Sequence, residues 1–305
     1  MAVTDTLRYQ RVTTVGDFFA LLKPRVMSLV VFTGLAGIVV APGHVHPLTA
    51  FTALLCIALA AGASGALNMA YDADIDGVMA RTATRPIPMG HIRREDAMAF
   101  GWAIAAFAVA TMWLFVNELA AGLLAFTVFF YVVVYTLGLK RRTPQNIVIG
   151  GLAGALPPAI GWASVTGSLG LAPIVLVAVI FMWTPPHFWA LSLWRCEDYA
   201  RAGVPMLPVV KGKRATRIQI FVYSLLLAPL GAVPAFIGLG GMLYMVLSAT
   251  MGFWMLLEAF ACLREKDEVR EPAAKRLFGV SLLYIFVPFA ALIVERLLHL
   301  PPLWT

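Results

Sequence analysis

The chain has 305 residues, of which 61% are hydrophobic and 13% are charged, and it carries a net charge of +7. Because roughly a quarter of the residues of soluble globular proteins are charged, this composition excludes a soluble globular enzyme and predicts a polytopic membrane protein. The basic residues gather in a few loops between apolar segments, so we expect no nucleic-acid partner.

Nine segments are apolar and long enough to cross a membrane, which requires roughly 20 residues per helix. We therefore predict an all-α fold in which residues 1–305 form a single membrane domain with nine transmembrane helices in one bundle. The predicted spans are 26–41, 49–69, 97–116, 120–139, 146–165, 172–194, 218–237, 242–261 and 277–297.

The distribution of Lys and Arg predicts the orientation in the membrane. These residues precede the first span and follow the second, fourth, sixth and eighth spans, whereas the other loops contain none. By the positive-inside rule, the N-terminal segment 1–17 is cytoplasmic and the C-terminus lies outside. This segment lacks the apolar core of a signal peptide. We expect a multi-pass protein of the bacterial cytoplasmic (inner) membrane, with the lipid bilayer as a partner.

A short basic segment precedes the first span. Phe18 and Phe19 would lie in the membrane interface, while Lys23 and Arg25 would face lipid phosphates. Both basic residues are interpreted as anchors.

The most distinctive polar stretch, residues 68–90, begins at the end of the second span. Asn68, Asp72 and Asp76 are four residues apart, so in a helix they form one polar line about two turns long. Asp74 would point elsewhere. Two carboxylates one turn apart suit Mg²⁺, which completes its shell with water and phosphate oxygens. The line therefore predicts a metal site for a phosphorylated substrate.

Arg81 and Arg85, also four residues apart, would supply planar donors for that phosphate. The alternative is a solvated helix end whose charges only hold it among the lipid headgroups. The preceding apolar segment favours the metal site, because the line then starts at membrane depth, where polar residues are costly and mostly functional.

The fourth span ends in a second basic cluster. Tyr131 and Tyr135 share one helical face, and Lys140 and Arg141 follow at the inner boundary, on the same side of the membrane as the acidic line. These two basic residues are either phosphate neighbours or topological anchors, and the pattern alone does not decide between them.

The sixth span contains His187 directly after Pro185 and Pro186, which we expect to kink or break the helix. His187 and Asp198 are eleven residues apart, close to three turns, which predicts a shared face with Trp194 nearby. His187 is either a site residue or a hydrogen-bonding partner between helices. Asp198 is either a ligand of a second metal ion or part of a cytoplasmic helix end.

Three stretches of the chain resemble one family. The first is NMAYDADIDGVMARTATRPIPMG, which resembles the N-x-x-x-D-x-x-x-D signature of the UbiA-type intramembrane prenyltransferases. The others are LKRRTPQNIVIGGLAGALPPAIGW and PPHFWALSLWRCEDYARAGVPMLPVVKG, which resemble the haem-farnesylating branch of that family, and the likeness covers most of residues 20–290.

The resemblance implies a nine-helix bundle around a central cavity that opens near the cytoplasmic side. It also implies transfer of farnesyl from farnesyl diphosphate to a vinyl group of haem B, with addition of water, giving haem O and diphosphate. Further partners would be haem A synthase or the assembly factors of a terminal oxidase.

The resemblance also implies site roles. Mg²⁺ on the diphosphate would be held by Asn68, Asp72 and Asp76, which with His187 form the catalytic set. The diphosphate would be bound by Arg81, Arg85, Lys140 and Arg141. The haem and prenyl pocket would contain His187, Tyr131, Tyr135 and Trp194. His187 would be an axial haem ligand or a proton acceptor. The chain lacks the family's second D-x-x-x-D pair in the sixth span and offers Glu197 and Asp198 instead, of which Asp198 is the candidate ligand of a second ion.

Three competing interpretations are open. A related Mg²⁺-dependent intramembrane prenyltransferase would use an aromatic acceptor such as a quinone precursor. The CDP-alcohol phosphotransferases share part of a signature around Asp76 but need Asp where this chain has Ala73, Arg94 and Met98. A polytopic transporter also has broken helices and intramembrane acids, but no internal repeat is visible here.

Overall fold

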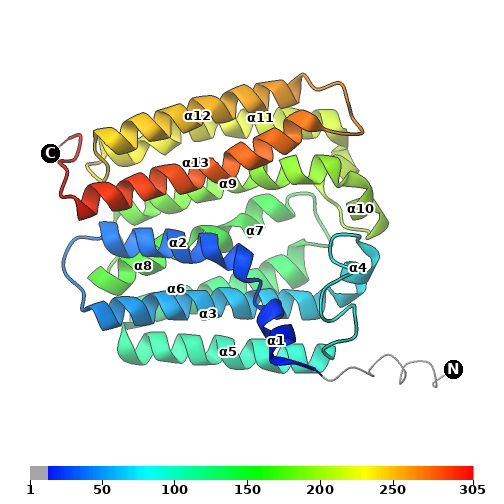
Figure 1. The fold of residues 1–305 in the computed structure, drawn as a ribbon, viewed down its shortest axis with the longest axis horizontal. Coiled ribbons are helices and arrows are strands. Elements are labelled where there is room, and N and C mark those ends of the chain that lie inside the picture. The colour runs from blue at the N-terminus through cyan, green and yellow to red at the C-terminus, as the bar shows by residue number, and fades with distance from the viewer. Residues whose placement is uncertain (1–12, 305) are drawn as a thin grey trace.

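The computed structural model describes residues 13–304, which form a bundle of long helices lying side by side (Figure 1). No β-strand occurs within this range. The predicted cytoplasmic segment 1–17 lies mostly outside the described residues. The prediction of an all-α fold is confirmed.

The elements follow one another along the chain with short connections. They are α1 (Val15–Leu21), α2 (Pro24–Val40), α3 (Pro47–Tyr71), α4 (Ala73–Val78), α5 (Arg94–Phe115), α6 (Glu118–Phe129), the π-helix η2 (Phe130–Leu139), α7 (Asn146–Ala155), α8 (Pro157–Thr166), α9 (Leu171–Trp194), α10 (Cys196–Arg201), α11 (Leu207–Phe236), α12 (Met242–Leu263) and α13 (Pro272–Leu297).

Eight helical segments of the described chain are long and apolar enough to cross a membrane, counting α6 with η2 and α7 with α8 as one span each. The pair α1 and α2, bent by 53° at a short break, brings the number to as many as nine. The protein is therefore a multi-pass membrane protein, and the nine predicted spans correspond to these nine segments.

The prolines have two different effects. Pro157 and Pro158 interrupt the fifth span, because α7 ends and α8 begins there. Of the predicted kink or break at Pro185 and Pro186, the break does not occur, since α9 continues through both as one helix. Both prolines are buried, and packing by neighbouring helices lets a helix tolerate the lost N–H donors. The chain leaves the helical path only at Arg195, where φ is −109° and ψ is 15°.

The short helices α4 and α10 lie at one end of the bundle, and the C-terminus lies at the other end (Figure 1). The acidic stretch and the α9–α10 corner therefore face the same end.

Three acids in the last helices serve packing. Glu258, which has no obvious partner in the sequence, accepts a hydrogen bond from Arg276 (3.1 Å). Glu271 is buried and accepts two from Arg217 (2.8 and 3.0 Å). Glu295 accepts two backbone hydrogen bonds at the start of α12 (2.6 and 2.8 Å). Each acid thus connects neighbouring segments and is engaged away from the acidic stretch.

Glycines bring α2 and α8 into backbone contact. A Cβ built on Gly37 would collide with the carbonyl oxygen of Pro158, and one built on Gly161 would collide with that of Gly34. Such small-residue contacts are typical of membrane helices, which gain little from the hydrophobic effect and associate through close packing.

The variant Gly161→Ala would force α2 and α8 apart, and we expect it to lower the free energy of unfolding by about 1–3 kcal/mol. Thermal unfolding in detergent measures this loss. Gly154→Ala in α7 is the matched control, because nothing lies within 4 Å of its added methyl group. Equal melting temperatures for wild type and Gly161→Ala would contradict the close contact.

Candidate active site

The acidic line, formed by Asn68, Asp72 and Asp76, lies at the junction between α3 and α4. Asp72 occupies the junction with φ −98° and ψ 12°. Backbone hydrogen bonds nevertheless run from Asp72 N to Asn68 O (3.0 Å) and from Asp76 N to Asp72 O (2.8 Å), so the one-turn spacing is kept. The three residues are 4%, 0% and 2% exposed for Asn68, Asp72 and Asp76. The line is thus a buried polar group at a helix junction.

Basic side chains from other segments neutralise these buried carboxylates. Lys140 Nζ contacts Asp72 Oδ2, and Arg141 Nη2 lies 3.4 Å from Asp72 Oδ1. Arg85 Nη1 lies 2.5 Å from Asp76 Oδ2. A buried charge is costly unless it is paired and hydrogen-bonded, so the cations are required for the line to be buried at all.

Asp74 lies outside this arrangement. Its side chain is 64% exposed, and it accepts hydrogen bonds from both terminal nitrogens of Arg141 (2.6 and 2.7 Å). These hydrogen bonds hold the pKa of Asp74 below its usual range. Arg141 therefore ties the exposed acid to the buried line.

The basic cluster is presented by the π-helix η2. Its wider turn is seen in the bond from Lys140 N to Tyr135 O (2.8 Å), five residues apart. Thr136 Oγ1 donates to Tyr131 O (2.9 Å) and accepts from Asn68 Nδ2 (3.2 Å). The π-helix thereby brings a hydroxyl and an amine to the acidic line. π-helices are frequent at functional sites.

The tyrosine pair also lies at this site. The rings of Tyr131 and Tyr135 are 5.4 Å apart, and a Cβ built on Gly150 would collide with the Tyr135 ring. Gly150 therefore makes room for this ring between η2 and α7. Arg81 is exposed and lies in the segment that follows α4.

Lys23 belongs to the candidate site. Its predicted role as a lipid anchor is wrong, because Nζ donates to Asn68 Oδ1 (3.1 Å). The bend between α1 and α2 turns its side chain inward, whereas the neighbouring Arg25 is exposed. The Lys-Pro pair at a helix start was the available signal.

The backbone of Lys23 is strained. It is left-handed, with φ 53° and ψ 57°, directly before Pro24. This conformation costs a residue with a side chain roughly 1–2 kcal/mol, and a following proline disfavours it further. Strain of this kind persists where the surrounding structure enforces it, often at functional sites.

Two variants separate the strain from the amine of Lys23. Lys23→Gly and Lys23→Ala both remove the amine, but only glycine relaxes the left-handed backbone. We expect the glycine variant to be more stable than the alanine variant by about 1 kcal/mol, measured as thermal unfolding in detergent. Lower stability of Lys23→Gly would show that the backbone is unstrained.

His187 lies in a second buried group on α9. Its ring stacks between Trp183 and Phe278 at 4.4 Å from each, and Nδ1 lies 2.7 Å from Ser281 Oγ. Ser281 Oγ also lies 2.7 Å from the Phe278 carbonyl oxygen, which can only accept, so the hydroxyl proton is used there. His187 Nδ1 then carries the ring proton, and Nε2 keeps its lone pair.

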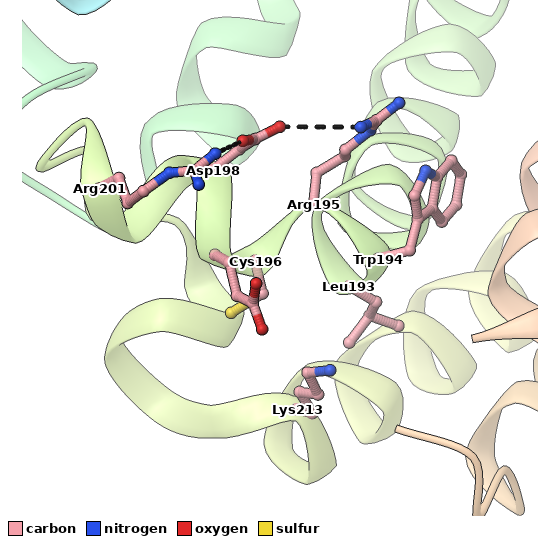
Figure 2. A pocket seen from close by; sticks show the side chains of 8 residues that line it. Leu193, Trp194, Arg195, Cys196, Asp198, Arg201 and Lys213 are labelled. Atoms are coloured by element: carbon pink, nitrogen blue, oxygen red, sulfur yellow. Dashed lines mark hydrogen bonds and ion pairs between the residues drawn. The ribbon is translucent and has the colours of Figure 1, made fainter. Parts of the chain in front are cut away.

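Asp198 does not share a face with His187, so that prediction is wrong. The helix ends at Trp194, and Asp198 belongs to α10 beyond the turn at Arg195. Figure 2 shows its carboxylate between Arg195 and Arg201, and these two contacts are ion pairs. The eleven-residue projection failed because it assumed one continuous helix. The role of Asp198 at a second ion stays a prediction.

The acidic line suits Mg²⁺ in its donor chemistry. Asp72, Asp76 and the amide oxygen of Asn68 are hard oxygen ligands. Among residues 13–304 no three His, Cys, Asp or Glu side chains converge. Two carboxylates at one place fit an ion that takes its remaining ligands from water and a phosphorylated substrate, and they do not fit a cage made of protein alone.

Solved structures share this fold. A digeranylgeranylglyceryl phosphate synthase matches with a TM-score of 0.75 at 16% identity, covering 92% of this chain and 99% of that chain. A UbiA homologue from Archaeoglobus fulgidus, bound to DMAPP and Mg²⁺, matches with a TM-score of 0.69 at 19% identity, covering 91% and 99%. These likenesses define the fold class.

Sequence comparison defines the family. The UbiA prenyltransferase family matches residues 30–285. The chain is similar to a protoheme IX farnesyltransferase of Parvibaculum lavamentivorans, at 62% identity over 93% of this chain and 90% of that protein. It is similar to another from Azorhizobium caulinodans, at 58% identity over 94% of each. The chain belongs to the UbiA prenyltransferase family, and it is an enzyme, a prenyltransferase.

Proposed function

We propose that this enzyme transfers farnesyl from farnesyl diphosphate to a vinyl group of haem B, with addition of water, giving haem O and diphosphate. One observation carries the proposal: Asp72 and Asp76 are buried and matched by cations, in a chain 62% identical to a protoheme IX farnesyltransferase. A quinone precursor as acceptor is the alternative, and the 62% identity favours haem.

The donor site lies at the acidic line. Asn68, Asp72 and Asp76 would hold Mg²⁺, which when bound supplies positive charge to the departing diphosphate. Asn68 would exchange its contact with Lys23 for the ion. The cations that now pair with the acids would turn to the diphosphate oxygens, joined by Lys23 and Arg81. The paired cations are Arg85, Lys140 and Arg141.

The transfer begins when the bond between the first farnesyl carbon and the diphosphate oxygen breaks, and the electron pair leaves with the diphosphate. The cationic side chains stabilise that charge where it develops. The faces of Tyr131 and Tyr135 stabilise the allylic cation left behind. Burial of the site excludes water that would quench this cation.

The acceptor reacts next. The π electrons of the vinyl group form the new carbon–carbon bond, and the cation that results on the haem side takes up water, which then loses a proton. His187 offers an Nε2 lone pair for one of two roles, ligation of the haem iron or acceptance of that proton. Trp194 meets Phe278 edge-on at 5.5 Å and adds to the aromatic wall beside His187.

The cellular setting follows the charge pattern of the loops. We place the protein in the bacterial inner membrane with its N-terminus in the cytoplasm and its C-terminus outside. The acidic line then faces the cytoplasm, where water-soluble diphosphates are available. Haem A synthase or terminal oxidase assembly factors are the proposed protein partners.

Incubation of the purified protein with haem B, farnesyl diphosphate and Mg²⁺ tests this function. We expect a product whose mass equals that of haem B plus farnesyl and a hydroxyl group, and we expect chelation of the metal to abolish it. A prenylated quinone precursor formed while haem B stays unmodified would overturn the choice of acceptor.

The effect on kcat of removing a carboxylate should depend on whether that carboxylate belongs to the acidic line. We expect Asp72→Ala and Asp76→Ala each to lower kcat at least about 100-fold, because each removes charge stabilisation from the leaving group. Asp74→Ala is the matched control, and its exposed side chain should make the loss less than about tenfold. Equal losses in all three variants would refute the assigned geometry.

His187→Ala should weaken haem binding about tenfold, equivalent to roughly 1.4 kcal/mol, and leave farnesyl diphosphate binding intact. Absorption titration with haem measures the first quantity, and a changed Soret band would distinguish iron ligation from proton transfer. A titration that overlays that of wild type would remove His187 from the acceptor site.

A further inference from the structure

A cavity of about 240 Å³ lies at the corner between α9 and α10. Figure 2 shows Trp194 and Arg195 on one side of it, with Arg201 across from them and Lys213 below. None of the residues that line it belongs to the acidic line. The cavity is therefore a second polar site at the same end of the bundle as the acidic line.

Cations outnumber acids around this cavity. Arg195, Arg201 and Lys213 line it together with only two carboxylates, those of Glu197 and Asp198. Lys213 also pairs with the buried Glu271 (3.3 Å), so the positive charge available to a guest comes mainly from the two arginines. The cavity thus favours an anionic guest.

Arg195 has hydrogen-bonding capacity that the protein does not use. Its Nη1 lies 3.7 Å from Asp198 Oδ2, beyond a normal hydrogen bond, while Arg201 binds the other oxygen of Asp198. Arg195 Nε is buried and has no hydrogen-bond partner among residues 13–304. Since buried donors are nearly always bonded, this atom indicates a missing acceptor. A planar guanidinium matches a carboxylate.

An aromatic path connects the cavity with His187. The ring of Trp194 meets Phe278 edge-on at 5.5 Å, and Phe278 stacks on His187 at 4.4 Å. Seven residues of unbroken helix separate His187 from Trp194, so they share a face and lie about 10 Å apart along the axis. A flat apolar molecule beside His187 would thus extend toward the cavity.

We propose that this cavity binds the carboxylate groups of the tetrapyrrole acceptor, with Arg195 and Arg201 as donors. The inference rests on the proposed function and adds an orientation to it. The carboxylates and vinyl groups of haem B lie on opposite edges of the macrocycle, so this placement leaves the vinyl edge free to face the farnesyl donor.

The partial exposure of the two arginines fits this role. Their side chains are 42% and 59% exposed for Arg195 and Arg201, whereas His187 is 6% exposed. An amphiphilic acceptor would keep its carboxylates at the wet end and its apolar ring among the helices. This arrangement avoids burying two charges in the bundle.

The test compares haem B with its dimethyl ester, which has the same ring and no carboxylate charge. In Arg195→Gln and Arg201→Gln we expect the haem dissociation constant and KM to rise roughly threefold to tenfold, while both constants stay unchanged for the diester. KM for farnesyl diphosphate should also stay unchanged. Arg195→Lys should recover part of the haem affinity, because it restores charge without the planar fork.

Arg214→Gln is the matched control, because Arg214 is exposed, follows Lys213 directly and does not line the cavity. Equal losses for haem and diester in the arginine variants would overturn the proposal, and so would unchanged haem binding. Activity that depends on anionic lipid in these variants, at unchanged haem affinity, would assign the cavity to a lipid headgroup and overturn it too.

The proposed function and the proposed carboxylate site can be refuted independently of each other. A wild-type enzyme that binds haem but does not farnesylate it would refute the proposed function. Absorption titrations with haem and the diester would still decide whether Arg195 and Arg201 recognise carboxylates.

Discussion

Two carboxylates buried inside a membrane bundle impose the constraint from which the site follows. Asp72 and Asp76 are buried at the end of α3, and neither can stay charged there without cations close by. The bundle supplies those cations from the segment after α4 and from the end of η2, while Lys23 at the start of α2 holds Asn68. Segments far apart in the sequence are thus fixed around one group of acids.

Irregular backbone gathers where that requirement must be met. The junctions between α1 and α2, between α3 and α4, and between α9 and α10, as well as η2, all depart from a straight α-helix. At each of these four irregular segments, side chains point toward a polar site that they would not reach from a regular helix. Irregular backbone is tolerated in a membrane protein where protein or a cavity satisfies it, so these departures and the site occur together.

The sequence predicted what depends on regular periodicity. Apolar lengths identified the spans, and the four-residue spacing of Asn68, Asp72 and Asp76 holds because backbone hydrogen bonds carry it across the junction. What failed depends on where a helix stops. The break fell at Arg195 and not at the paired prolines, since packing compensates a missing N–H donor. No sequence pattern distinguishes a π-helix from an α-helix of the same composition, so the place of Thr136 was not foreseen.

The short helix α10 lies between the two polar sites at this end of the bundle, the acidic line and the cavity beside Arg195. Its Tyr199 packs in one apolar cluster with Ile75 and Met79 of the α4 region, while its Asp198 lines the cavity beside Arg195. A helix of six residues has too few internal hydrogen bonds to stand alone, so these contacts on both sides hold it in place. On the proposed function, two amphiphilic substrates would keep their charged groups apart on the two sides of α10. Their apolar parts would then meet deeper among the helices, where exclusion of water would protect an allylic cation.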